Sequence, residues 1–128
     1  MNSKEIKTPQ VFKDIYDLNL TILQVTKSFP REYKYSLGEE LRKSAIHILE
    51  KINPLFSNPS IEKVPVIAEN ISQMQYLRLL VRLAMDVKCM NTQKFTLLNQ
   101  QIEKINKQLF AWQKAQVRKT NSTQLPKS

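Results

Sequence analysis

QMQYLRLLVRLAMDVK, residues 73–88, decides the fold because it predicts a helix that is apolar around most of its circumference. At about 100° per residue, its apolar side chains cover roughly two thirds of the helix surface. These side chains are Met74, Tyr76, Leu77, Leu79, Leu80, Val81, Leu83, Ala84, Met85 and Val87. The remaining polar strip holds Gln75, Arg78, Arg82 and Asp86. Such a helix needs other helices or subunits around it, and we expect its two arginines to face a partner that accepts positive charge.

A first helix is predicted from Pro9 to about Ser28. Thr8-Pro9 is a typical helix start, since a capping residue precedes a proline at the first helical position. Apolar residues then recur at helical spacing until Pro30, which cannot continue the helix.

A second helix is predicted over residues 37–52. Ser36 and Glu39 have the spacing of a capping box, in which each side chain binds the backbone of the other residue. Gly38 falls in the first turn, where its low helix propensity suggests that a neighbouring backbone comes close.

The helix that contains residues 73–88 has two predicted starting points. It begins near Ile61 or only after Val64, because Pro65 is acceptable in the first turn of a helix and nowhere deeper. Asn91-Thr92 separates it from a fourth helix, which continues to about Arg118.

The fourth helix has a heptad seam, with apolar residues that alternate by three and four. The seam consists of Phe95, Leu98, Ile102, Ile105, Leu109 and Trp112. Four helices with short loops predict an all-α, antiparallel up-down-up-down four-helix bundle over residues 9–118. An N-terminal arm, residues 1–8, precedes the bundle. Residues 119–128 have no periodicity and are predicted to form a disordered basic tail.

The first and third helices have more apolar surface than their neighbours in one bundle require, and Phe110 and Val117 lie off the heptad seam. This excess predicts a homo-oligomer. The alternative is a thick core with a few exposed hydrophobic residues.

The composition narrows the class of protein. One Gly among 128 residues disfavours a sheet protein and a glycine-built phosphate loop, and the single Cys89 cannot form an internal disulfide. The chain has neither an apolar run of membrane-spanning length nor the apolar core of a signal peptide. We therefore expect one soluble cytoplasmic domain.

The net charge of +9 belongs almost entirely to the second half of the chain. Residues 1–69 hold 10 Lys and Arg against 9 Asp and Glu, whereas residues 70–128 hold 10 against 2. This asymmetry favours an anionic partner, such as a nucleic acid, an acidic protein or a membrane surface. A solvated basic face is the alternative.

No catalytic, metal-binding or cofactor motif is recognisable, so the protein is predicted not to be an enzyme. The carboxylates Asp14 and Asp17, and likewise Glu39 and Glu40, are expected to be solvated charges.

One spacing leaves an enzymatic alternative. Arg42 and His47 resemble the Arg-x4-6-His motif of the HEPN ribonucleases, in which such a pair cleaves RNA at a dimer interface. The alternative role for His47 is that of a surface residue beside Glu50.

The candidate binding residues are cationic. Lys107, Lys114 and Arg118 fall within about 40° of one another on the fourth helix, opposite its heptad seam. Together with Arg78, Arg82, Arg31, Lys34 and the tail residue Lys119, they could form a surface that binds phosphates. Trp112 and Phe95 are assigned to the core, so aromatic residues are not expected among these charges, and neither base stacking nor sequence-specific readout is expected.

Several of these residues also form a recognisable pattern. Phe29-Pro30-Arg31, residues 34–38 (KYSLG) with Leu41, and then Leu77-Arg78 and Arg82-Leu83 resemble the accessory variability determinant (Avd) proteins of diversity-generating retroelements. The resemblance covers roughly residues 10 to 118, and its most specific part is the aromatic-Pro-Arg turn with the Leu-Gly that follows. Four-helix proteins encoded in insertions of ribosomal RNA genes share this turn. They usually end the second helix with an Asn-Ile-Ala-Glu-Gly-like sequence, whereas residues 51–54 are KINP here.

The resemblance to the Avd family implies a pentameric barrel of four-helix bundles with a positively charged surface. It implies binding of RNA and DNA without sequence specificity, and association with the retroelement reverse transcriptase during error-prone copying of template RNA. Arg78 and Arg82 match basic positions of the family's third helix, so the resemblance assigns them a binding role. A structural module of the ribosomal-insertion type is the alternative.

Overall fold

Helices make up every regular element of the computed structural model, which describes residues 9–124, with side chains described through residue 120. The long helices are α1 (Gln10–Lys27), α3 (Leu37–Ile52), α5 (Lys63–Asp86) and α6 (Thr92–Gln124). Two short helices, α2 (Arg31–Lys34) and α4 (Pro54–Ser57), lie in the connections on either side of α3.

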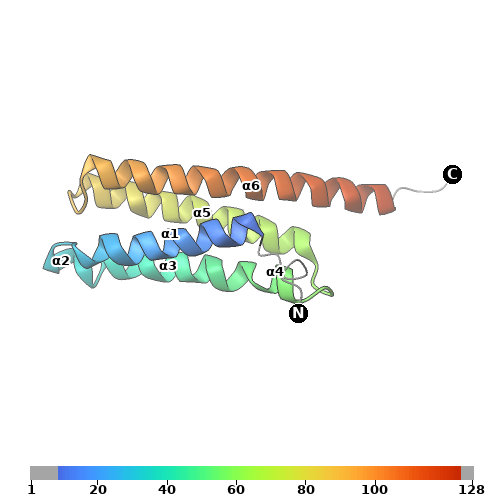
Figure 1. Ribbon diagram of the computed structural model, residues 1–128, viewed down its shortest axis with the longest axis horizontal. Helices are drawn as coiled ribbons and strands as arrows, with labels where there is room; N and C mark the ends of the chain where they lie inside the picture. The colour runs from blue at the N-terminus through green and yellow to red at the C-terminus, as the bar shows by residue number, and fades with distance from the viewer. Residues whose placement is uncertain (1–8, 125–128) are drawn as a thin grey trace, which may run out of the picture.

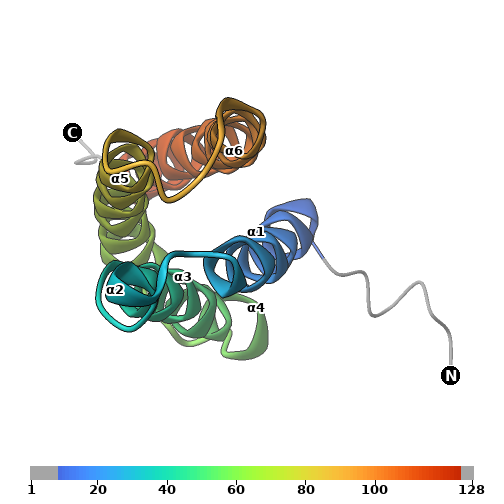
Figure 2. The same cartoon turned by 90° about the vertical axis from the view of Figure 1, so that its left-hand side faces the viewer.

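The long helices run back and forth along one axis (Figure 1). Seen from the end of the bundle, they follow one another in the order α1, α3, α5, α6, and α6 packs against α1 to complete the circuit (Figure 2). The all-α four-helix bundle predicted from the sequence is confirmed.

The core consists of the apolar stripe of each helix. The heptad prediction for α6 is confirmed, since Leu98, Ile102, Ile105 and Leu109 are buried, and Phe95 and Trp112 are partly buried at the two ends. In α5 the buried apolar residues are Ile67, Met74, Leu77, Leu80, Val81 and Ala84. Tyr76, Leu79 and Leu83 remain exposed on α5, so four helices do not cover all of its apolar surface.

The ends of the helices depend on local chemistry. Pro9 occupies the cap position of α1, and the predicted cap Thr8, like the rest of the predicted arm 1–8, lies outside the described residues. The start of α5 at Lys63 places Pro65 within the first turn, where its missing N–H costs no hydrogen bond. Asn91 caps α6, because its side-chain oxygen accepts a hydrogen bond from the backbone N–H of Lys94 at 2.9 Å.

The predicted capping box at Ser36 is wrong. Ser36 lies at the cap position of α3, but its hydroxyl donates a hydrogen bond to the backbone carbonyl of Glu32 at 3.2 Å and makes no cap bond. The short helix α2 explains the difference, because it places the Glu32 carbonyl one turn before Ser36 and offers the hydroxyl a competing acceptor.

The close approach predicted at Gly38 is confirmed. A Cβ atom at this position would lie 3.3 Å from the carbonyl oxygen of Tyr33 and 3.4 Å from the ring of Phe29. Gly38 therefore lets the chain between α1 and α3 fold tightly against the first turn of α3.

The last helix is longer than the sequence pattern predicts. Its apolar periodicity ends before Arg118, yet α6 continues to Gln124 and extends beyond the other helices (Figure 1). Residues 119–124 contain neither Gly nor Pro, so nothing in their backbone chemistry stops the helix. Within the predicted tail, residues 125–128 lie outside the described part of the chain.

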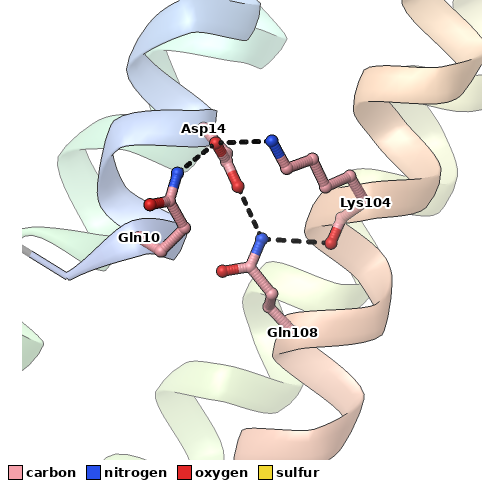
Figure 3. Close-up of polar contacts among 4 residues, drawn as sticks. All are labelled: Gln10, Asp14, Lys104 and Gln108. Carbon is pink, nitrogen blue, oxygen red and sulfur yellow. Dashed lines mark hydrogen bonds and ion pairs between the residues drawn. The ribbon is translucent and has the colours of Figure 1, made fainter.

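Asp14 joins α1 to α6. The sequence predicted that Asp14 would be a solvated charge, and this prediction is wrong. Its side chain is only 7% exposed. Gln10 donates a hydrogen bond to Asp14 Oδ1 at 2.9 Å, Gln108 donates one to Oδ2 at 2.7 Å, and Lys104 Nζ lies 3.4 Å from Oδ1 (Figure 3). Burial acts to raise the pKa of Asp14, but the hydrogen bonds from the two glutamines and the charge of Lys104 outweigh it, so the pKa lies below its ordinary value.

Candidate nucleic-acid interface

The two arginines of α5 lie in a groove between α5 and α6, and both are already paired. Arg78 Nη2 donates a hydrogen bond to Glu103 Oε2 on α6 at 2.8 Å. Arg82 Nε lies 3.2 Å from Asp86 Oδ1, one turn further along α5. The groove has a volume of about 500 Å³ and is lined by Gln75, Arg78, Leu79, Arg82, Phe95, Asn99 and Glu103.

Both ion pairs are accessible to solvent, since the four side chains are between 40% and 67% exposed. Exposed ion pairs of this kind contribute only about 0 to 1 kcal/mol to stability, because water and salt screen them. The arginines can therefore exchange their carboxylate partners for another anion at small cost.

The predicted cationic stripe on α6 is present. Lys107, Lys114 and Arg118 are exposed, and none forms an ion pair with a described residue. Their spacing puts them on the side of α6 opposite the buried seam. We call these three residues the α6 cationic face.

An aromatic residue lies next to this face, contrary to the sequence prediction. Phe110 is 49% exposed and lines a shallow hollow on α6 together with Lys114 and Val117. The other two aromatic side chains behave as predicted. Phe95 packs against the core, and Trp112 packs against it as well while stacking on Phe56 with ring centroids 5.3 Å apart.

Arg31 and Lys34 do not join the α6 cationic face. Both belong to α2, which lies at one end of the bundle, whereas the C-terminal part of α6 projects from the opposite end (Figure 1). The predicted binding residues thus divide into three groups: the α5 arginines, the α6 cationic face and the α2 pair.

The Arg42 and His47 side chains have different neighbours. Arg42 Nη2 donates a hydrogen bond to the carbonyl of Lys34 at 3.2 Å, so Arg42 ties α3 to α2. His47 Nε2 lies 3.8 Å from Glu69 Oε1 on α5, and this contact replaces the one with Glu50 that the sequence suggested. The two side chains of the HEPN-like motif are therefore not directed at a common site within one chain.

A second groove, about 440 Å³ in volume, lies between α1 and α3. Its lining is mainly apolar and includes Tyr16, Leu20, Leu23, Ile46 and Leu49, with Glu39, Arg42 and Lys43 among the polar residues. Four of the apolar side chains, Tyr16, Leu20, Leu23 and Ile46, are 44% to 54% exposed. We call these four residues the α1–α3 apolar face.

Comparison with known proteins identifies the family. A family model described as bAvd-like matches residues 10–116. These residues include the whole of α1, α3 and α5 and most of α6, with Lys107 and Lys114 but not Arg118. The chain belongs to the bAvd-like family. The resemblance to accessory variability determinant proteins, noted from the turn at Phe29-Pro30-Arg31 and the α5 arginines, is thereby confirmed. No curated protein matches this bAvd-like chain.

Along the described residues, no helix combines the length and the apolarity needed to cross a lipid bilayer. The same part of the chain contains no group of three or more His, Cys, Asp and Glu residues placed to hold a metal ion.

Proposed function

We propose that the protein is a non-enzymatic accessory subunit that holds RNA and DNA for a retroelement reverse transcriptase during the error-prone copying of template RNA, the step that leads to mutagenic retrohoming. Membership of the bAvd-like family supports the accessory role. The observation that carries the nucleic-acid part of the proposal is the α6 cationic face, three exposed cations without a carboxylate partner among the described residues. The protein acts in the cytoplasm, without a cofactor.

Binding in this proposal is electrostatic. Lysine and arginine side chains neutralise phosphates and release the counterions that had condensed on the nucleic acid, so the affinity falls steeply as salt rises. Phosphate contacts carry no sequence information, and binding is therefore non-specific. Phe110 adds one exposed ring beside Lys114 on which a base can stack without sequence preference.

The first test neutralises the α6 cationic face. The triple substitution Lys107→Gln, Lys114→Gln and Arg118→Gln is expected to weaken the binding of a mixed-sequence RNA or DNA oligonucleotide about tenfold at low salt. The slope of log affinity against log salt should become shallower by up to about 0.9 for each phosphate that the variant no longer neutralises. Fluorescence anisotropy over a salt series measures both quantities.

Three exposed lysines on α1 and α3 provide the control. Lys13→Gln, Lys27→Gln and Lys51→Gln remove the same charge from a different part of the bundle and should change the slope much less. Equal decreases in affinity for the two triple variants would mean that net charge alone governs binding.

Intact RNA at the end of each titration is expected of a protein without nuclease activity, whereas RNA cleavage that His47→Ala abolishes would favour the ribonuclease alternative.

The proposal includes a homopentameric barrel, the assembly that the family resemblance implies. The α1–α3 apolar face and the exposed Tyr76 and Leu83 of α5 give the protomer two separate apolar surfaces. Ring assembly requires two different surfaces that fit each other, because each subunit contacts one neighbour on each side. These two surfaces support a ring, and the number of subunits comes from the family resemblance alone.

Leu23→Glu tests the assembly. Leu23 is 54% exposed in the α1–α3 apolar face, so a carboxylate there leaves the fold of one subunit intact but has to be desolvated at a subunit contact. Sedimentation equilibrium should show the wild-type chain as an oligomer and Leu23→Glu as a monomer with unchanged helical circular dichroism. Gln24→Glu adds the same charge at the next exposed residue and should remain oligomeric. A wild-type monomer at micromolar concentration would contradict the assembly.

A further inference from the structure

The few carboxylates in the basic half of the chain lie beside the arginines of the α5–α6 groove. Residues 70–128 contain only two, Asp86 and Glu103. The structure pairs Glu103 with Arg78 at 2.8 Å and Asp86 with Arg82 at 3.2 Å. Both carboxylates thus neutralise the arginines of the α5–α6 groove, while the α6 cationic face is left without a carboxylate among the described residues.

The groove has the chemistry of a site for a phosphodiester group. Arginine binds phosphate and carboxylate through the same planar array of N–H donors, so a carboxylate on the arginine occupies the position that a phosphate oxygen would take. The side-chain amides of Gln75 and Asn99 line the same groove and can donate hydrogen bonds to phosphate or sugar oxygens.

The groove is also continuous with the α6 cationic face. Glu103 and Lys107 are four residues apart on α6 and therefore neighbours on one side of the helix. A nucleic-acid strand held on Lys107 passes next to Glu103, and its phosphates then compete with this carboxylate for Arg78.

We propose that the α5–α6 groove is a phosphodiester-binding site whose arginines are held by Glu103 and Asp86 until a nucleic acid displaces these carboxylates. The inference rests on the proposed function, because it assumes that nucleic acid reaches this surface. Its consequence is that two native carboxylates set the affinity of the protein for nucleic acid. Replacing either one should strengthen binding.

The test measures the affinity of the full-length chain for a fluorescein-labelled, mixed-sequence single-stranded RNA at about 0.15 M salt, where charges more than about 8 Å apart are largely screened. Glu103→Gln and Asp86→Asn keep the shape of each side chain and remove its charge. Each is expected to strengthen binding about two- to fivefold, the range that corresponds to an exposed ion pair. Asp17→Asn, at an exposed position of α1, changes the net charge equally and is the control, expected to leave the affinity within about 1.5-fold.

A double-mutant cycle then separates two effects of Glu103→Gln: the loss of competition for Arg78, and a general change in the electrostatic potential of the surface. In an Arg78→Ala background, Glu103→Gln should no longer strengthen binding, because the carboxylate has no arginine to withhold. A gain that persists in this background would overturn the inference. So would affinities for Glu103→Gln and Asp86→Asn that match the Asp17→Asn control.

These outcomes are distinct from a failure of the proposed function. If the wild-type chain retains neither RNA nor DNA at any salt concentration, both the proposed function and the inference are wrong. If the wild-type chain binds with a steep salt dependence and the carboxylate variants resemble the control, the proposed function stands and the groove is not a phosphate site.

Discussion

Ile105→Ala is expected to lower the free energy of unfolding by about 2 to 5 kcal/mol. Ile105 is fully buried on the heptad seam of α6, at 0% exposure, where α6 closes over the other helices. The substitution removes the transfer free energy of the deleted methyl and methylene groups and leaves a cavity that the tightly packed neighbours fill only in part. Urea denaturation followed by circular dichroism measures the change.

The control for this prediction is Leu97→Ala on the same helix. Leu97 is 47% exposed, so its truncation should change the free energy of unfolding by no more than about 0.5 kcal/mol. Because the proposed assembly would make the apparent stability depend on concentration, all variants are compared at one protein concentration. Equal effects at Ile105 and Leu97 would show that α6 does not close the bundle by its predicted seam.

The seam was predictable because a heptad is a local property. Residues 98, 102, 105 and 109 share one side of any helix, whatever surrounds that helix, and the least polar side of a helix in water turns inward. Helical periodicity also located the long helices and put the three cations of the α6 cationic face together. The close packing at Gly38 was predictable for another local reason, the low helix propensity of glycine in a first turn.

The interhelical polar contacts were not predictable in this way. Asp14 and Asp17 look alike in the sequence, three residues apart on one helix, yet only Asp14 faces α6. The pairing of Arg78 with Glu103 likewise depends on how α5 and α6 are aligned along each other. Alignment of two helices is set by the packing of the whole bundle, and no local spacing encodes it.

The hydrogen bond of the Ser36 side chain was also not predictable from the sequence. Its spacing to Glu39 fits a capping box, but α2 brings the Glu32 carbonyl within reach of the same hydroxyl. Several local hydrogen bonds then compete at one residue, and their free energies differ by less than sequence rules can resolve.

Asp14→Ala is expected to lower the free energy of unfolding by about 2 to 3 kcal/mol at neutral pH. The substitution removes a carboxylate that accepts hydrogen bonds from Gln10 and Gln108 and pairs with Lys104, in the network that links α1 to α6. Gln108 keeps a second acceptor, the backbone carbonyl of Lys104 at 3.1 Å, whereas the side-chain amide of Gln10 loses its bond to Asp14. Asp17→Ala is the control. It makes the same change at an exposed position of α1, gains the same helix propensity and should alter stability by no more than about 0.5 kcal/mol.

The pH dependence tests whether the charge of Asp14 is responsible. Its pKa in the folded protein lies below the ordinary value of 3.8, so the unfolded chain takes up this proton first as the pH falls. The stabilisation is therefore fully present above about pH 5, where the carboxyl is ionised in both states, and disappears progressively as the pH falls through the unfolded and then the folded pKa. The difference in free energy of unfolding between wild type and Asp14→Ala should shrink over this acid range, whereas the Asp17→Ala curve should stay nearly parallel to wild type. If the difference for Asp14→Ala stayed constant from about pH 6 to about pH 2, packing rather than the buried carboxylate would hold α1 against α6.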